Sequence, residues 1–202
     1  MQVFKDTSMI QTETKPIYIL LTNTGSLFST AIGFYTKQRF NHVSICLNDD
    51  FKAIYSFGRK HPKNPIVGGF VNEIETQIYD HFVGTSCIVL KKEVSLEKYA
   101  RVHESIKRFE TDKLIYGYNL IGFAGFIVNI PIKRQRAFFC SQFVGEVLKQ
   151  GGVDFTSKPS ELVKPSDFLG HDKFVPIYQG DIIDFLSNPK KHLDSNELEF
   201  YL

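Results

Sequence analysis

A short turn between two apolar runs is the feature that most limits how this chain can fold. Residues 43–47 alternate between apolar and polar side chains, Asn48-Asp49-Asp50 provides a turn, and residues 51–57 form the return run. A period of two places successive side chains on opposite faces of a strand. The pattern therefore predicts a β-hairpin, which commits this part of the chain to an antiparallel sheet.

Other apolar runs extend that sheet and add helices. Further strands are expected at residues 16–22, 70–79, 86–90 and 173–178. The clearest helix spans residues 95–109 behind an N-cap at Ser95, and a shorter helix is expected at residues 27–37. Residues 58–69 contain two prolines and three glycines and are expected to form a loop. This order predicts an α+β fold in which a mainly antiparallel sheet packs on helices.

The third cysteine opens a helical pattern. Apolar side chains follow Cys140 at positions 143, 144, 147 and 148, and Gly151-Gly152 provides a stop. Cys140 is therefore expected at a helix N-terminus, where unpaired N–H groups and the helix dipole favour a thiolate. A cysteine that acts only as a small buried hydrophobic residue is the alternative.

Length and charge fit a single globular domain. The chain has 202 residues, of which 43% are hydrophobic and 23% charged, and a formal net charge of +2. We expect a flexible N-terminal arm at residues 1–15, one domain at residues 16–180 and a C-terminal extension at residues 181–202. The small net charge and the lack of a basic block argue against nucleic acid as a partner.

Three cysteines, Cys46, Cys87 and Cys140, are an odd number without metal-ligand spacing. They predict neither a disulfide framework nor a metal site, and no motif indicates a cofactor. No signal-peptide pattern precedes the first apolar run, so a reducing cytoplasm is the expected location.

Residues 114–132 carry no charged side chain. This length approaches that of a membrane span, but three glycines, two asparagines and Pro131 interrupt it. We expect a buried helix and turn, with a membrane-contacting surface as the less favoured alternative.

A nucleophilic cysteine needs a base within hydrogen-bond reach, and that base needs an orienting partner. Among the six histidines, His42 is the best candidate because it opens a strand, which holds an imidazole rigidly. The other histidines lie in a proline-rich loop, in the polar tail or beside charged residues.

The segments Asn41-His42-Val43-Ser44-Ile45 and Phe139-Cys140-Ser141-Gln142-Phe143-Val144 together resemble a known family. They are similar to the circularly permuted NlpC/P60-type, papain-like cysteine hydrolases, and closest to the YiiX-like branch. In that family the histidine-bearing strand precedes the cysteine-bearing helix. Residues 20–25, 116–119 and 165–168 resemble further segments of the family. The resemblance covers roughly residues 17–169 and implies a permuted papain-like fold.

The resemblance also implies roles for individual residues. Cys140 would be the nucleophile, His42 the general base and then the acid, and the N–H of Cys140 a donor to the oxyanion. Tyr116 and Tyr118 would line the pocket for the substrate.

The family's third polar residue lies on the strand after the histidine strand. Here we favour Ser56 as the residue that orients the imidazole of His42. Tyr55 and Glu73 are the alternatives, because a one-residue change of strand register reverses which side chains face the imidazole.

The activity implied is that of a cysteine peptidase or amidase, a thiol protease in the broad sense. Its substrates would be small peptides or amino-acid amides, with cell-wall-type peptides as one option. A first alternative is a binding module that kept the fold and lost the chemistry. A second is a lipid acyltransferase or acylhydrolase, because lecithin:retinol-acyltransferase-like proteins share the order of histidine before cysteine.

Overall fold

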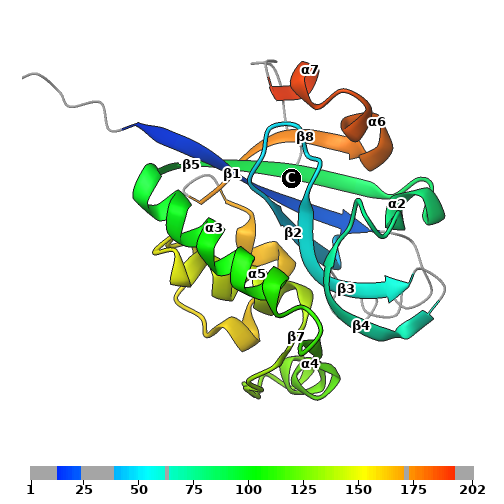
Figure 1. Cartoon of the computed structure of the whole chain (residues 1–202), viewed down its shortest axis with the longest axis vertical. Helices are drawn as coiled ribbons and strands as arrows, with labels where there is room; N and C mark the ends of the chain where they lie inside the picture. Colours follow the sequence, from blue (N-terminus) through cyan, green and yellow to red (C-terminus); the bar gives the residue numbers. More distant parts are fainter. Residues whose placement is uncertain (1–12, 24–38, 62–63, 171–172, 194–202) are drawn as a thin grey trace, which may run out of the picture.

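The computed structural model describes residues 13–23, 39–61, 64–170 and 173–193. Its main element is a six-stranded sheet with the strand order β4-β3-β2-β1-β5-β8, in which every neighbouring pair is antiparallel (Figure 1). The strands are β1 (Thr14–Asn23), β2 (His42–Cys46), β3 (Ile54–His61), β4 (Asn64–Asn72), β5 (Ser86–Ser95) and β8 (Val175–Asp181). The predicted α+β class with an antiparallel sheet is confirmed.

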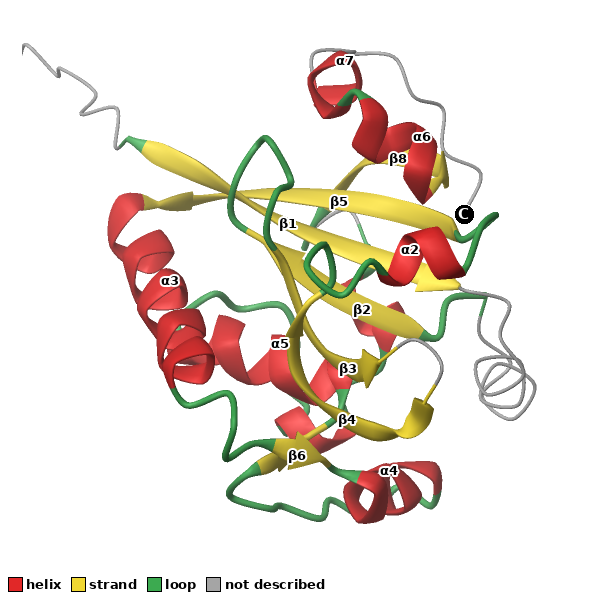
Figure 2. Cartoon of the chain, turned by 45° about the vertical axis from the view of Figure 1, so that its right-hand side comes forward, coloured by secondary structure: helices red, strands yellow, loops and turns green. Residues whose placement is uncertain are grey.

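Helices cover both faces of this sheet, and a short parallel ribbon joins two of the connecting segments (Figure 2). The helices are α2 (Ile78–His81), α3 (Leu96–Thr111), α4 (Leu120–Ile127), α5 (Cys140–Gln150), α6 (Ile182–Ser187) and α7 (Pro189–Leu193), with 3₁₀ turns η1 (Ser160–Leu162) and η2 (Pro165–Phe168). The ribbon pairs β6 (Gly117–Tyr118) with β7 (Ala137–Phe138).

Burial on both faces explains why the central strands are apolar almost throughout. Along β1, Ile17, Ile19 and Leu21 belong to the core beneath α3 and α5. The alternate residues Tyr18 and Leu20 belong to a second core, which α2 and α6 complete. Because the side chains of a strand alternate between faces, one strand serves both cores.

The predicted hairpin is present, with its return strand starting later than expected. Strands β2 and β3 pair with Ile45 opposite Tyr55. The backbone of Phe51 adopts a φ of 51°, and its ring packs against Tyr18 and Phe185 instead of joining the sheet. The loop therefore extends to residue 53, and β3 starts at Ile54.

The prediction of a loop over residues 58–69 is wrong. Most of this segment belongs to the β3–β4 hairpin, in which Gly58 pairs with Gly69 and Arg59 with Gly68. Proline and glycine are tolerated because β4 is an edge strand, which has a neighbour on one side only. The glycine at position 68 also makes room for a neighbour, because a Cβ there would lie 3.1 Å from the Cβ of Tyr118.

Two predicted helix starts are confirmed. The hydroxyl of Ser95 accepts a hydrogen bond from the N–H of Lys98 at the start of α3, and α5 starts at Cys140. The uncharged segment forms β6, α4 and a turn, in which Phe126 is buried and Ile121 is exposed. Among the described residues, no helix combines the length and apolar character needed to cross a membrane.

The C-terminal part of the domain differs from the expected extension. Helix α6 follows β8 directly, and its Ile182 and Phe185 are fully buried in the second core. The packed body of the protein therefore continues beyond residue 180. Residues 1–12 of the predicted arm and the predicted helix at residues 27–37 lie outside the described residues.

Candidate active site

Cys140 lies at the first position of α5, and the packing of that helix fixes where its thiol points. Phe143, Val144 and Val147 are fully buried against the sheet. The hydroxyl of Ser141 donates to the carbonyl oxygen of Val163 at 2.6 Å, which holds the first turn. The N-cap residue of α5 is Phe139, whose side chain forms no capping hydrogen bond to the first N–H groups of the helix.

His42 reaches Cys140 from the first position of β2. The strand is held there by its register with β1, in which His42 lies opposite Thr22 and the N–H of Asn41 donates to the carbonyl of Thr22 at 3.2 Å. The imidazole, whose side chain is 23% exposed, lies close enough to Cys140 for the charge of that sulfur and hydrogen bonding to it to raise the pKa of His42. The structure therefore brings together two side chains that lie almost a hundred positions apart in the sequence.

Glu73 provides the second contact of the imidazole. It follows the last residue of β4, and its N–H donates to the carbonyl of Ile54 at 2.8 Å, which extends the hairpin by one residue. Its Oε1 lies 2.6 Å from Nε2 of His42. Because Nε2 is occupied by Glu73, Nδ1 is the ring nitrogen left for Cys140.

Three hydroxyl groups complete the surroundings of this buried carboxylate. Ser44 donates to Oε1 at 2.8 Å and Ser56 donates to the same oxygen at 2.5 Å. Tyr79 of α2 donates to Oε2. Glu73 is only 3% exposed, and these hydrogen bonds compensate for the loss of its hydration.

His42 and Glu73 each stabilise the charged form of the other. Burial lowers the pKa of His42, but attraction to Glu73 and Cys140 and the hydrogen bonds to both outweigh it and raise the pKa to about 10. Burial raises the pKa of Glu73, but the attraction to His42 and the hydrogen bonds from His42, Ser56 and Tyr79 bring it below its ordinary value. At neutral pH the site therefore holds an imidazolium and a carboxylate.

This pair makes stability depend on pH. The ordinary pKa of histidine is 6.5 and that of folded His42 is about 10, so the stabilisation is complete below pH 6.5 and is lost as pH rises towards 10. Between about pH 6.5 and 8.5 we expect the unfolding free energy to fall by up to about 1.4 kcal/mol per pH unit. Urea unfolding of the wild-type chain and of His42→Gln should show this decline only in the wild type.

The range ends at about pH 8.5 so that the titration of Cys46 and Cys87 does not contribute to the measured slope. Burial raises the pKa of Cys46 and Cys87 to about 12 from an ordinary value of 9.0, so both contribute a decline of their own above about pH 9. His81→Gln, at an exposed histidine, is the matched control and should keep the wild-type slope. Equal slopes in the wild type and His42→Gln would contradict the charged pair.

In the structure Glu73, which was one of the alternatives, makes the contact with the imidazole that was expected of Ser56. Ser56 does face the same side of the sheet as His42, but its hydroxyl donates to Glu73 and not to the ring. Tyr55 points to the opposite face, where its ring stacks on Phe70 and its hydroxyl donates to Glu110 at 3.4 Å. The hydroxyl of Ser56 thus contacts the carboxylate that meets the ring, so serine and glutamate belong to one hydrogen-bonded group.

Two hydroxyl donors were not foreseen in the sequence. Ser44 lies two positions after His42 on the same strand and therefore faces the same side, a signal that period-two alternation could have provided. Tyr79 comes from a short helix in a segment expected to be a strand, and no sequence signal placed it beside Glu73.

The two predicted substrate tyrosines lie in different surroundings. Tyr118 packs on Gly68, and burial raises its pKa, with a further increase from the charge of Cys140 and an opposing effect from Arg59. Tyr116 instead packs in the aromatic core, where its ring lies 4.8 Å from that of Phe109. The structure thus brings Tyr118 into the electrostatic surroundings of Cys140 and places the ring of Tyr116 among the core aromatic side chains.

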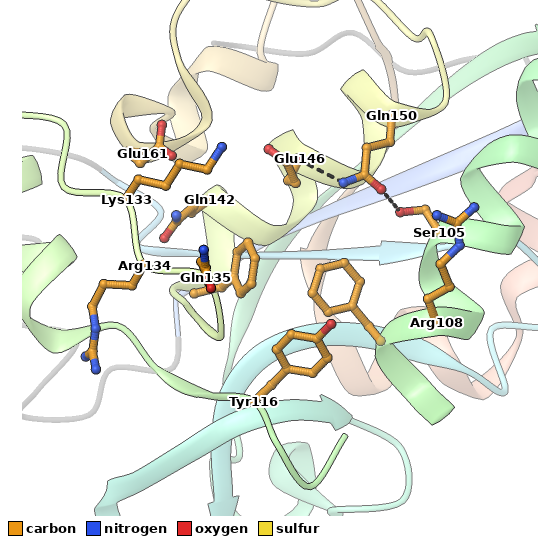
Figure 3. A pocket seen from close by; sticks show the side chains of 12 residues that line it. Ser105, Arg108, Tyr116, Lys133, Arg134, Gln135, Gln142, Glu146, Gln150 and Glu161 are labelled. Carbon is orange, nitrogen blue, oxygen red and sulfur yellow. Dashed lines mark hydrogen bonds between the residues drawn. The ribbon is translucent and has the colours of Figure 1, made fainter. Parts of the chain in front are cut away.

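A cavity of about 340 Å³ lies beside α5, between α3 and the segment that precedes β7 (Figure 3). Neither Cys140 nor His42 lines it. A row of hydrogen bonds follows one wall, in which Ser105 donates to Gln150 at 2.7 Å and Gln150 donates to Glu146 at 2.9 Å. Tyr116 also lines this cavity. The predicted substrate-binding residue Tyr116 therefore faces a cavity that does not include Cys140 or His42.

Among the described residues, no group of three or more histidine, cysteine, aspartate or glutamate side chains is arranged to hold a metal ion. No protein-family model matches the chain, and no curated protein matches it significantly.

Proposed function

We propose that this chain is a cysteine hydrolase of amide bonds, with the permuted papain-like arrangement of the NlpC/P60 type that the sequence resembles. The observation that carries the proposal is that one imidazole meets both groups: Oε1 of Glu73 lies 2.6 Å from Nε2 of His42, and Cys140 lies close enough to help raise the pKa of the ring. A nucleophile, a base and an orienting carboxylate in this order are the parts that acyl transfer requires.

The arrangement accounts for each step of such a reaction. The thiolate of Cys140 attacks the carbonyl carbon, and the N–H groups at the start of α5 donate to the oxygen that becomes negative. The imidazolium of His42 gives its proton to the leaving nitrogen as the C–N bond breaks, which leaves a thioester on Cys140. Water then attacks the thioester, His42 takes one proton from it, and the C–S bond breaks to release the acid and restore the Cys140 thiolate beside the imidazolium.

The position of Glu73 also favours an enzyme over a binding module that has lost its chemistry. A module without chemistry would be expected if the imidazole had only a weak orienting partner, such as the hydroxyl of Ser56. A carboxylate with an Oε1–Nε2 distance of 2.6 Å holds the imidazole in one orientation and favours its charged form. Small peptides or amino-acid amides remain the proposed substrates, with Tyr118 beside the reacting carbonyl.

Trapping the acyl intermediate tests the proposal directly. The wild-type chain is mixed with an activated ester such as p-nitrophenyl acetate and with a panel of peptide and amino-acid amides, then analysed by intact-mass and peptide-mapping mass spectrometry. We expect one acyl group on Cys140, and release of the amine from at least one amide. Acylation spread over all three cysteines, or none at Cys140, would contradict the hydrolase.

The reactivities of the three thiols provide a second prediction. Cys46 and Cys87 are fully buried, and burial raises the pKa of each to about 12, so almost no thiolate forms near neutral pH. Cys140 lies at a helix N-terminus beside an imidazolium, which activates a sulfur. Iodoacetamide should therefore modify Cys140 at least about tenfold faster than the other two. Rates within a factor of about two of one another would count against an activated thiol.

A further inference from the structure

Helix α4 and the turn after it expose three aliphatic side chains at one end of the molecule. Ile121 is 59% exposed, Val128 61% and Ile130 56%, and we call these three residues the apolar tip. Figures 1 and 2 show α4 at the end of the molecule opposite α6 and α7. Exposed aliphatic side chains gathered on one short segment mark a surface that contacts something apolar.

The exposure of the apolar tip is built into the local structure. The N–H of Ile130 donates to the carbonyl of Gly125 at 2.8 Å, and Asn129 adopts the left-handed conformation with a φ of 59°. The turn lies so close to α4 that a Cβ on Gly125 would come within 2.6 Å of the carbonyl oxygen of Ile130. Val128 and Ile130 are therefore held outward by a tight turn.

A cationic loop follows the apolar tip directly. It contains Lys133, Arg134 and Arg136, all exposed. Their side chains form no ion pair within the part of the chain that the structure describes. Two carboxylates, those of Glu146 and Glu161, line the same cavity as Lys133 and Arg134 (Figure 3). No aspartate or glutamate occurs between Lys113 and Gly145, so this end of the molecule attracts anions.

We propose that the apolar tip and the cationic loop dock the protein on the surface of a membrane that contains anionic lipids. Aliphatic side chains enter the boundary between headgroups and acyl chains, while lysine and arginine contact the anionic headgroups. Charge complementarity favours a membrane over a second copy of this chain. In a two-fold dimer the same cationic loops would face each other, with no carboxylate from this segment to offset them.

Docking in this orientation would bring α5 close to the membrane. Phe126, on the inner side of α4, packs on Phe139 with 5.6 Å between the ring centroids, and Phe139 immediately precedes Cys140. Lys164 also lies over the ring of Phe126, at 5.9 Å from its centroid. The proposal itself rests on the surface alone and holds whether or not Cys140 is a nucleophile.

Co-sedimentation with vesicles tests the proposal on the full chain. We expect binding to vesicles of phosphatidylcholine with a minor fraction of phosphatidylserine, and much weaker binding to phosphatidylcholine alone. Raising the salt concentration to about 0.5 M should release the protein, because exposed charges are then screened. Binding that is equal on both kinds of vesicle, or absent from both, would overturn the proposal.

Two variants separate the apolar and the electrostatic contributions. Arg134→Glu/Arg136→Glu should weaken binding at least about thirtyfold, because each cation near an anionic surface contributes roughly a fivefold factor. Ile121→Ser/Val128→Ser/Ile130→Ser should weaken it about tenfold or more. The matched controls, Lys190→Glu/Lys191→Glu and Val83→Ser/Val175→Ser, change exposed residues elsewhere and should bind as the wild type does.

Further outcomes distinguish this proposal from the hydrolase and from self-association. Cys140→Ala should bind vesicles as the wild type does, so a loss of turnover in that variant leaves the docking surface intact. Controls that weaken binding as much as the test variants would show that the effect is not local, and would overturn the proposal. A dimer in sedimentation velocity that Ile121→Ser/Val128→Ser/Ile130→Ser dissociates would assign the apolar tip to contact between copies instead.

Discussion

Replacing Cys140 by alanine should reduce the turnover of any cleaved amide by about a thousandfold or more, because the sulfur that would carry the acyl group in the proposed reaction is then missing. The substitution removes one sulfur from a side chain that is 7% exposed, so we expect a stability cost of only about 1 kcal/mol. Initial rates with the best amide of the trapping panel measure the first effect, and urea unfolding measures the second.

The other cysteines provide the control for this substitution. Cys87 is fully buried, in the core on the other face of the sheet from α5, and Cys87→Ala should keep turnover within a few-fold of the wild type. His42→Ala should lose turnover nearly as completely as Cys140→Ala, because residues that act as one unit are not additive. If Cys140→Ala kept more than about a tenth of the wild-type rate, the nucleophile would have to be another group.

Replacing Glu73 by alanine should lower the unfolding free energy by about 3–5 kcal/mol. The substitution leaves the imidazolium of His42 without its carboxylate and three hydroxyl groups, those of Ser44, Ser56 and Tyr79, without their acceptor. Leaving buried donors without an acceptor lowers the unfolding free energy far more than breaking an exposed ion pair of the same kind does. A loss of this size is a large part of the stability of a typical domain.

Glu73→Gln tests the same point if the alanine variant does not fold. The amide keeps the volume but presents an NH₂ group to donors and removes the charge, so we expect a smaller loss of about 1–3 kcal/mol. The iodoacetamide rate of Cys140 should fall in the same variant, because a neutral partner no longer favours the imidazolium. That second measurement separates an effect on the site from a general loss of stability.

Glu75 is the matched control for these substitutions. It lies two positions from Glu73, is exposed, and accepts a single hydrogen bond from Asn72 at 3.2 Å. Glu75→Ala should change the unfolding free energy by no more than about 0.5 kcal/mol. If Glu73→Ala and Glu75→Ala had the same unfolding midpoint, the carboxylate cluster would not be the stabilising feature described above.

The sequence was most informative where one local pattern sufficed. The alternation that predicted the hairpin appears as β2 and β3, and the apolar spacing after Cys140 appears as α5. The cap at Ser95 is also present. In each case the signal lies within a few consecutive residues, because helices and hairpins are stabilised mainly by near neighbours.

The sequence was least informative where composition and context disagree. Proline and glycine at residues 58–69 indicated a loop, but an edge strand tolerates both, and only the strand order shows that β4 is at an edge. The C-terminal segment is mostly polar, so its sequence did not indicate that Ile182 and Phe185 are buried. These two side chains pack in the core on the second face of the sheet. Such errors arise because tertiary packing outweighs local propensity.

The sequence by itself determined the class of the fold and singled out Cys140 and His42 as candidates for a nucleophile and a base. Both follow from local rules: a strand places His42 at its first residue, and a helix start gives Cys140 its unpaired N–H groups. Only the tertiary structure decided which residue meets the other nitrogen of the imidazole. The identity of that residue depends on how far β4 remains paired with β3, because Glu73 directly follows the last residue of β4. Hydrogen bonds from Ser44, Ser56 and Tyr79 compensate for the burial of the Glu73 carboxylate beside the ring. Contacts of this kind join four separate segments, and no single stretch of sequence specifies their register.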